Sequence, residues 1–228
     1  RSYTLLKRHR EQLQHLEAML LGQAGLLPED SEDPYVLQLK KDHDFYQKKY
    51  GWTHGLTRQH WTFLGARPAN FPTLRLAQLA TVLVQAPHLL SSLLEESGDL
   101  TSFKKIFQTP PSPYWRQHYT FGKPSSKTTS NGLSEQSVQL LLINFVLPIW
   151  FAYGEFHDQE EWKDRCFSLL QSLPAEQNYV LRKFVSHAWI PKTAFDSQGM
   201  LELYRRYCSA QKCLSCKIGQ SLLRGHPK

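Results

Sequence analysis

The stretch that decides the fold class runs from residue 72 to residue 86 and reads PTLRLAQLATVLVQA. Wound as an α-helix, it is apolar almost all round, which is typical of a helix buried in the middle of a bundle. Pro72 suits the first turn of such a helix, and Pro87 ends it. The stretch therefore predicts a helical bundle with this segment at its centre.

Helical spacing of apolar residues continues on both sides of this segment. A second buried helix is expected over 134–153, and Asp33 followed by Pro34 predicts the start of a helix that Gly51 ends. The sequence has no internal repeat and no alternation of strands with helices. We therefore expect one all-α, or nearly all-α, domain over 1–228, a multi-helix orthogonal bundle. Its other helices are expected over 5–21, 88–96, 100–107, 158–172, 174–187, 195–208 and 213–223.

Length and composition agree with a folded domain. The chain has 228 residues, of which 41% are hydrophobic, so it can bury a core and is neither disordered nor fibrous in type. Its longest apolar run, 140–153, is shorter than a bilayer span of about 20 residues and contains Asn144 and Pro148. The chain opens on Arg1 without a signal peptide. We expect a cytoplasmic protein with no membrane partner, seen here as the C-terminal part of a longer chain.

The net charge of +7 is unevenly spread. Residues 51–130 carry +5 and residues 176–228 carry +6, whereas residues 1–50 are neutral and residues 131–175 carry −4. Two basic blocks that converge on one face would attract polyanions, as in nucleic-acid-binding proteins. The alternative is a generic basic surface without a specific partner.

Residues 109–132 are expected to form a long central loop, since they are rich in Pro, Gly, Ser and Thr. Aromatic residues around Trp115 are interleaved there with Arg116 and Lys123. Aromatic platforms beside basic side chains are what single-stranded nucleic acids bind. Two alternatives stay open: the rings fold back into the core, or the residues around Tyr119 form a short hairpin.

Three of the four cysteines stand close together near the C-terminus. Cys208, Cys213 and Cys216 have the spacing C-x4-C-x2-C, within a Cys-rich module expected over 204–223. This spacing suits a loop that closes on a metal through thiolates, as in zinc and iron–sulfur sites, and does not decide between the two. Cys166 is the preferred fourth ligand, because an all-thiolate shell closes a structural site.

Other arrangements of these cysteines stay open. His157, His187 or His226 could replace Cys166 as the fourth ligand. Two alternatives need no metal: reduced thiols packed at a helix junction, or a redox pair formed by the last two cysteines of the motif.

A polar cluster is expected at the start of the central helix. Asn70 can cap the helix that begins at residue 71 or 72, and Arg67 stands just before it. Arg75 and Gln78 share one face of an otherwise apolar helix, and a buried guanidinium needs a carboxylate, a carbonyl or an anion. These residues form either an anion site at a helix N-terminus or a structural tie between loops.

Common catalytic motifs are absent from the sequence. It has no nucleophile elbow, Walker loop, HExxH motif or dinucleotide fingerprint. Because no catalytic constellation is found, whether the chain is an enzyme stays open, and an enzyme complete within it is the least favoured class.

Four stretches, 21–27, 67–78, 195–198 and 207–219, resemble a known family. Together they are similar to the C-terminal part of the uncharacterised bacterial domain of unknown function family 2851. The resemblance implies a bacterial protein of unknown activity. It also implies longer relatives with a strand-rich, nuclease-like N-terminal region that has no counterpart in this chain.

The segment 206–216 also resembles the C-terminal cluster loop of helix-hairpin-helix DNA glycosylases, which are all-α and basic. It departs from that pattern, since its first gap is shorter and the last cysteine is missing after Cys216. No hairpin with a catalytic Lys or Asp accompanies it.

These features lead to a hypothesis of function. The chain is expected to be a nucleic-acid-binding accessory module with a metal-stapled C-terminus, attached to a catalytic region absent from it. The alternative is a structural protein-interaction domain whose basic face binds an acidic protein partner. The candidate anion- or nucleic-acid-binding residues are Arg67, Asn70, Arg75, Gln78, Trp115, Arg116, Lys123, Arg205 and Arg206.

Overall fold

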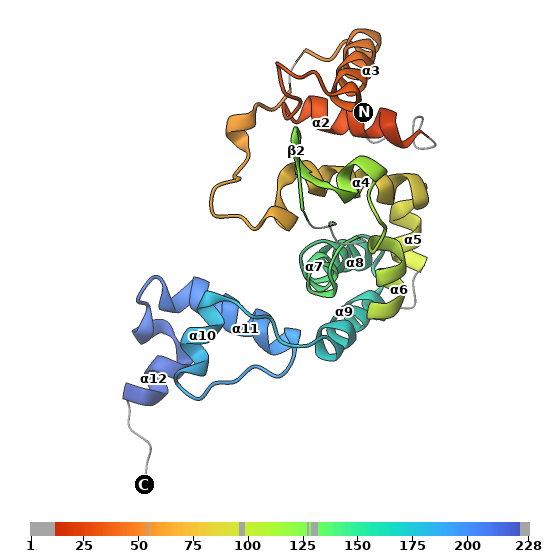
Figure 1. The fold of residues 1–228 in the computed structure, drawn as a ribbon. Helices are drawn as coiled ribbons and strands as arrows, with labels where there is room; N and C mark the ends of the chain where they lie inside the picture. The colour runs from red at the N-terminus through yellow and green to blue at the C-terminus, as the bar shows by residue number, and fades with distance from the viewer. Residues whose placement is uncertain (1–11, 54, 96–98, 127, 129–131, 224–228) are drawn as a thin grey trace. The chain divides into compact units, whose positions relative to one another are not determined.

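The computed structural model describes residues 12–53, 55–95, 99–126, 128 and 132–223. The chain divides into two compact units, residues 1–138 and residues 139–228, and each is described by itself. The described residues are mostly helical, with one two-stranded sheet (Figure 1). The predicted, nearly all-α fold class is confirmed, and the single domain over 1–228 stays a prediction.

The first unit consists of α-helices, short 3-10 helices labelled η, and two short strands. They are α2 (Leu13–Gln23), α3 (Pro34–Tyr50), η1 (Arg58–His60), η2 (Pro68–Asn70), α4 (Pro72–Gln85), α5 (Leu89–Glu95), α6 (Leu100–Phe107), η3 (Pro113–Arg116), β1 (His118–Thr120) and β2 (Lys123–Pro124). The helix α7 (Glu135–Leu141) begins in this unit and ends in the next. Residues 5–11 of the first predicted helix lie outside the described part of the chain.

The remaining elements belong to the second unit. They are the π-helical turn η4 (Leu142–Val146), α8 (Leu147–His157), α9 (Glu160–Ser172), α10 (Tyr179–Val185), α11 (Ala194–Leu203), the π-helical turn η5 (Tyr204–Cys208), η6 (Cys213–Ser215) and α12 (Lys217–Leu223).

The helix α4 lies at the centre of the first unit, as its apolar sequence predicts. Leu74 and Ala77 of α4 belong to one buried cluster with side chains of α2, α3 and the segment 115–121. Ala80 of α4 belongs to a second cluster with Leu16 and Tyr46. Because both faces of α4 meet apolar side chains, its burial stabilises the whole unit.

Local caps begin and end α3 where the sequence predicts. The Asp33 carboxylate accepts the backbone N–H of Tyr35 at 2.9 Å, and Gly51 ends α3 in the left-handed conformation. Gly25 follows α2 with φ of 63°, and a Cβ there would lie 2.2 Å from the carbonyl oxygen of Leu56. Only glycine fits this close approach.

The predicted helix over 134–153 extends further, to His157, and contains a wide turn. Pro148 has no N–H, and its ring would clash with the carbonyl of Asn144 in a regular α-helix. The backbone widens into the π-helical turn η4, where the N–H of Leu147 bonds to the carbonyl of Leu142. The helix thus continues past a proline instead of ending at it.

The same helix, Glu135–His157, is long and apolar enough to cross a membrane, and 44% of its most apolar window is buried. The helices α4 and α5, bent by 75°, pass this test together. The core helices of water-soluble domains pass the same test of length and hydropathy. Passing this test is therefore weak support for a membrane span. The expected absence of a membrane partner stays a prediction, as does the cytoplasmic location.

Three predicted helices of the second unit are shorter than expected. The helix over 174–187 forms only as α10, because Pro174 pairs with Thr193 in an isolated bridge and Asn178 then caps the helix start. The helix over 195–208 ends as α11 and continues in the π-helical turn η5. The helix over 213–223 is divided between η6 and α12.

Candidate functional site

The polar cluster at the start of α4 assembles around Arg75. One terminal nitrogen of its guanidinium, Nη1, donates to Gln78 Oε1 at 3.0 Å. The other, Nη2, donates to Asn70 Oδ1 at 2.6 Å and to Ser137 Oγ at 3.1 Å. Three of the four residues predicted for this cluster are therefore in contact, and Ser137 of α7 joins them from 62 residues away.

The charge of Arg75 is not neutralised by an acidic side chain. Among the described residues, no carboxylate lies within ion-pair distance of its guanidinium, and burial lowers the pKa of Arg75. The nearby Glu135 is paired instead with Lys104 at 2.9 Å. The predicted cap by Asn70 is wrong: α4 begins after Phe71 without a side-chain cap, because the Asn70 oxygen is taken by Arg75. Arg67 is exposed beside the cluster.

The segment 109–132 is more ordered than a loop. The strands β1 and β2 pair as a short hairpin, with Gly122 at φ of 68° in its turn. Trp115 is fully buried, and its indole N–H donates to the hydroxyl of Tyr35 at 3.0 Å. Trp115 is therefore not available to stack on a base, which corrects its prediction as a binding residue. Both alternatives open for this segment, rings in the core and a hairpin, occur together.

The basic residues of the same segment remain on the surface. Arg116 and Lys123 are exposed, whereas Tyr114 is stacked between Tyr35 and His118 at centroid distances of 4.1 and 4.0 Å. The hairpin thus presents cations without the aromatic platform that the sequence suggested.

A buried carboxyl group lies next to Tyr35, whose hydroxyl also accepts the indole N–H of Trp115. Glu17 of α2 is 1% exposed, and its Oε2 accepts the hydroxyl hydrogen of Tyr35 at 2.8 Å. Burial raises the pKa of Glu17 to about 7, because the charged form is poorly solvated there, and the nearby hydroxyl groups of Ser112 and Tyr35 only partly oppose this. Glu17 Oε1 and Ser112 Oγ are buried without a hydrogen-bond partner among the described residues. The same burial raises the pKa of Tyr35.

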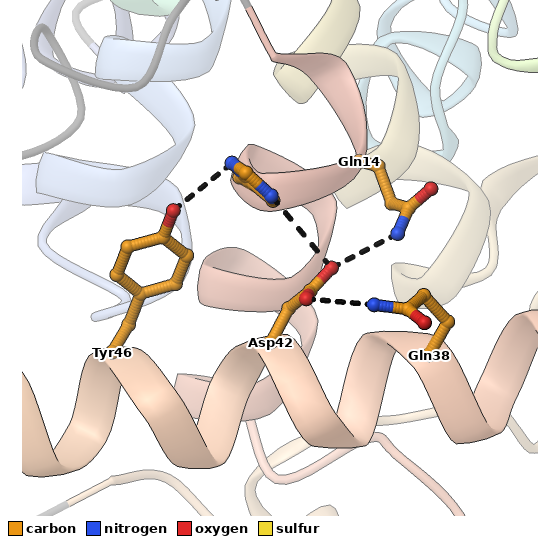
Figure 2. A network of polar contacts seen from close by, with 5 residues as sticks. Gln14, Gln38, Asp42 and Tyr46 are labelled. Atoms are coloured by element: carbon orange, nitrogen blue, oxygen red, sulfur yellow. Dashed lines mark hydrogen bonds and ion pairs between the residues drawn. The ribbon is translucent and has the colours of Figure 1, made fainter.

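A second polar network joins α2 to α3 (Figure 2). Asp42 accepts the side-chain amides of Gln14 and Gln38, both at 2.9 Å, and lies 4.0 Å from His15 Nε2. His15 Nδ1 is 2.9 Å from the Tyr46 hydroxyl. The carboxylate of Asp42, the imidazole of His15 and the phenol of Tyr46 follow one another as in a proton relay. Burial raises the pKa of Tyr46, however, which disfavours its ionised form as a nucleophile. We interpret this network as a link between the two helices.

The cysteine segment of the second unit borders a pocket of about 580 Å³. Cys208, Cys213 and Cys216 lie in its wall together with His187, and most of the remaining wall is apolar. As the side chains stand, no three His, Cys, Asp or Glu residues of the described chain are grouped closely enough to hold a metal ion. The structure brings the three predicted thiols to one pocket without forming a finished site.

Cys166 lies elsewhere in the second unit. Its thiol is buried in α9 and donates to the carbonyl of Leu147 at 3.5 Å, and burial raises its pKa to about 11. It is not part of the pocket wall, so the predicted shell of four thiolates is not assembled. Of the alternative ligands, His226 lies outside the described residues, and the ring of His157 packs on Tyr153.

Arg205 and Arg206 are exposed in the π-helical turn η5, which ends at Cys208. Arg206 Nη1 lies 3.8 Å from a carboxylate oxygen of Glu202. Both cations are open to solvent, where such a pair contributes little to stability.

Sequence patterns missed three features of these clusters. Glu17 stands four residues after Leu13 and four before Leu21, on the apolar stripe of α2, and a charged residue in that stripe is a usable signal of burial. Asp42 and Tyr46 are likewise four apart on one helix face. Ser137 carries no such signal, since its contact with Arg75 depends on the tertiary fold.

The fold and its clusters define a mostly helical chain with a basic surface and no assembled catalytic centre among the described residues. A family model described as "Protein of unknown function (DUF2851)" matches residues 2–179. The chain belongs to this family, as the resemblance of its sequence motifs implied. No curated protein and no solved structure matches it. The comparisons give no support to the resemblance with helix-hairpin-helix glycosylases.

Proposed function

We propose that this chain is a nucleic-acid-binding accessory module that contacts the phosphate backbone through the Arg75 cluster. The observation that carries the proposal is the half-buried Arg75 guanidinium, which has only neutral side chains as partners. A cation in this setting gains most from an anionic partner, since its solvation is reduced and no carboxylate of the described residues compensates it.

Donors around Arg75 suit a phosphate group. Three of the five N–H groups of the Arg75 guanidinium donate to these neutral partners, which leaves Nε–H and one Nη1–H, on different edges of the plane, as single donors to further acceptors. The start of α4, next to Asn70, has no side-chain cap. Its first backbone N–H groups and the positive end of the helix dipole favour a negative charge.

Exposed cations of the same unit extend the surface on which a polyanion would lie. Arg67 stands three residues before Asn70, Arg116 lies just before the hairpin, and Lys123 lies in its second strand. The second unit has exposed cations of its own, Arg205 and Arg206. Backbone contacts of this kind position a nucleic acid and do not read its sequence.

The test measures the affinity of the full chain for unrelated duplex DNA and single-stranded RNA by fluorescence anisotropy over a range of salt concentrations. The logarithm of affinity should fall linearly with the logarithm of salt concentration. The triple variant Arg67→Glu, Arg116→Glu, Lys123→Glu should bind more than about tenfold more weakly and have a shallower salt slope. The matched control is Lys41→Glu, an exposed lysine in the neutral segment 1–50.

Arg75 itself is tested by Arg75→Lys, which keeps the charge and loses the planar fork. We expect a loss of affinity without unfolding, checked by circular dichroism. No measurable binding at low salt, or an equal loss in the Lys41 control, would refute the proposal.

A second candidate, a protein-interaction domain, is favoured by exposed apolar side chains of the second unit. Phe145, Phe151 and Phe156 are 44%, 42% and 84% exposed along η4 and α8. Aromatic residues of this kind are enriched at protein interfaces. Unlike the basic-face interaction expected from the sequence, this candidate relies on apolar contacts. The triple charge variant should therefore associate as the wild type does, and Phe156→Ser should lose self-association or partner binding.

A further inference from the structure

We propose that Cys208, Cys213, Cys216 and His187 bind one zinc ion. The sequence analysis prefers Cys166 as the fourth metal ligand. In the structure, it is His187 that lies in the same pocket wall as the three thiols. The proposal concerns the second unit alone and does not depend on nucleic-acid binding by the first.

The hydrogen bond made by His187 leaves one nitrogen of its ring available for a metal. Its Nδ1 lies 2.8 Å from the backbone carbonyl oxygen of Lys183. Because a carbonyl only accepts hydrogen bonds, Nδ1 carries the proton, and Nε2 of the neutral ring keeps its lone pair. Metal-binding histidines almost always donate their other N–H in this way, which fixes the tautomer and the ring.

The turn that carries two of the thiols is held in place by backbone contacts. The N–H of Cys216 bonds to the carbonyl of Cys213 at 3.2 Å, which closes the C-x2-C turn. A Cβ at Gly219 would lie 2.3 Å from that same carbonyl oxygen, so α12 packs directly on the turn. The N–H of Lys212 bonds to the carbonyl of Tyr207 at 2.9 Å, which ties the turn to the segment of Cys208.

The donor set favours zinc over an iron–sulfur cluster. Three thiolates and one imidazole form a four-ligand shell that is common in structural zinc sites. Iron–sulfur clusters are mostly held by four cysteines, and the pocket wall has three. A zinc ion with three thiolates has a net charge of −1, which the adjacent Lys212 and Lys217 oppose.

Binding must draw the pocket wall together, because the four side chains are not grouped around one point as they stand. Cys208 and Cys213 are exposed, so their side chains are free to turn toward His187. The ion would therefore order the segment 204–223, and its removal would loosen that segment.

The test loads the full chain, purified anaerobically, with zinc alone and with cobalt(II) alone. We expect one zinc ion per chain and, with cobalt, the absorption of a tetrahedral thiolate site. His187→Ala should lower zinc affinity by at least about a hundredfold. Removing a residue that only hydrogen-bonds to a metal ligand already costs up to about a hundredfold, and here the ligand itself is removed. Cys166→Ala and the matched histidine control, His157→Ala, should leave affinity and stoichiometry unchanged.

A second measurement needs no variant. Zinc should protect Cys208, Cys213 and Cys216 from alkylation, as mapped by mass spectrometry, and leave the slow reaction of the buried Cys166 as it is. Three results would each overturn the proposal: no zinc bound at micromolar concentration, visible absorption of an iron–sulfur cluster, or loss of the metal in Cys166→Ala with retention in His187→Ala.

Discussion

Replacing Glu17 with glutamine should make the protein more stable at alkaline pH and flatten the pH dependence of its stability. Glu17 Oε2 accepts a hydrogen bond from Tyr35, whereas its Oε1 and the nearby Ser112 Oγ have no partner among the described residues. A glutamine keeps an acceptor for Tyr35, and its amide N–H can donate to Ser112. The substitution therefore removes a buried charge and offers a hydrogen bond to a group that has none.

The magnitude follows from the pKa of Glu17, which rises from 4.5 to about 7 on folding. The folded state thus binds the proton more tightly than the unfolded state. Its stabilising effect is complete below pH 4.5 and is lost as the pH rises through about 7. A shift of about 2.5 pKa units corresponds to about 3 kcal/mol, most of which is lost between pH 5 and pH 8.

The assay is urea unfolding of both proteins at pH 5 and pH 8, followed by circular dichroism and tryptophan fluorescence. We expect the free energy of unfolding of Glu17→Gln, relative to the wild type, to increase by about 2 to 3 kcal/mol between the two pH values. The other ionisable groups of the unit are present in both proteins and cancel in the comparison. The control is Glu32→Gln, which removes an exposed carboxylate of the same unit.

The reasoning is refuted if Glu17→Gln and the wild type lose stability in parallel from pH 5 to pH 8. A pH-independent destabilisation of Glu17→Gln would also refute it, because the carboxylate would then be favourable in its charged form. An equal effect in Glu32→Gln would assign the pH dependence to net charge and not to burial.

Two further predictions concern local geometry in the first unit. Asp33→Ala should lower the free energy of unfolding in urea by about 1–3 kcal/mol, because it removes the cap of α3 and the acceptor of the Tyr114 hydroxyl. The control, Glu32→Ala, should lower it by less than about 0.5 kcal/mol. Gly25→Ala should cost several times more than Gly51→Ala, which is expected near 1 kcal/mol. Both glycines have φ near 62–63°, but only at Gly25 does a Cβ meet backbone, so equal losses would show that this close approach is not a constraint.

Much of the helical framework could be predicted because its signals are local. The apolar stretch 72–86 and the Asp33–Pro34 cap act within a few residues of the chain, and the structure has helices at both places. The hydrogen bonds of a helix join residues four apart, so capping and apolar periodicity decide its position. The π-helical turn before Pro148 also follows from a local cause, although its exact form depends on the packing around it.

The sites depended more on distant contacts. Arg75 was predicted to need a partner, but Ser137 reaches it only because the fold brings this residue of α7 to the start of α4. Trp115 has the composition of a binding platform and is instead enclosed by Tyr35 and Phe121. Whether an aromatic ring is exposed is decided by what packs over it, and the sequence of the loop does not contain that information.

The sequence by itself determined that this chain is mostly helical, where most helices begin and end, and which family it belongs to. The tertiary structure decided which side chains lie together: His187 and not Cys166 in the pocket wall with the three clustered thiols, and Glu17 against the hydroxyl of Tyr35. The physical reason is the distance along the chain over which the interactions act, since secondary structure follows from residues that are neighbours in sequence. A site is a set of side chains brought together by packing, and its charges take their pKa values from that enclosure.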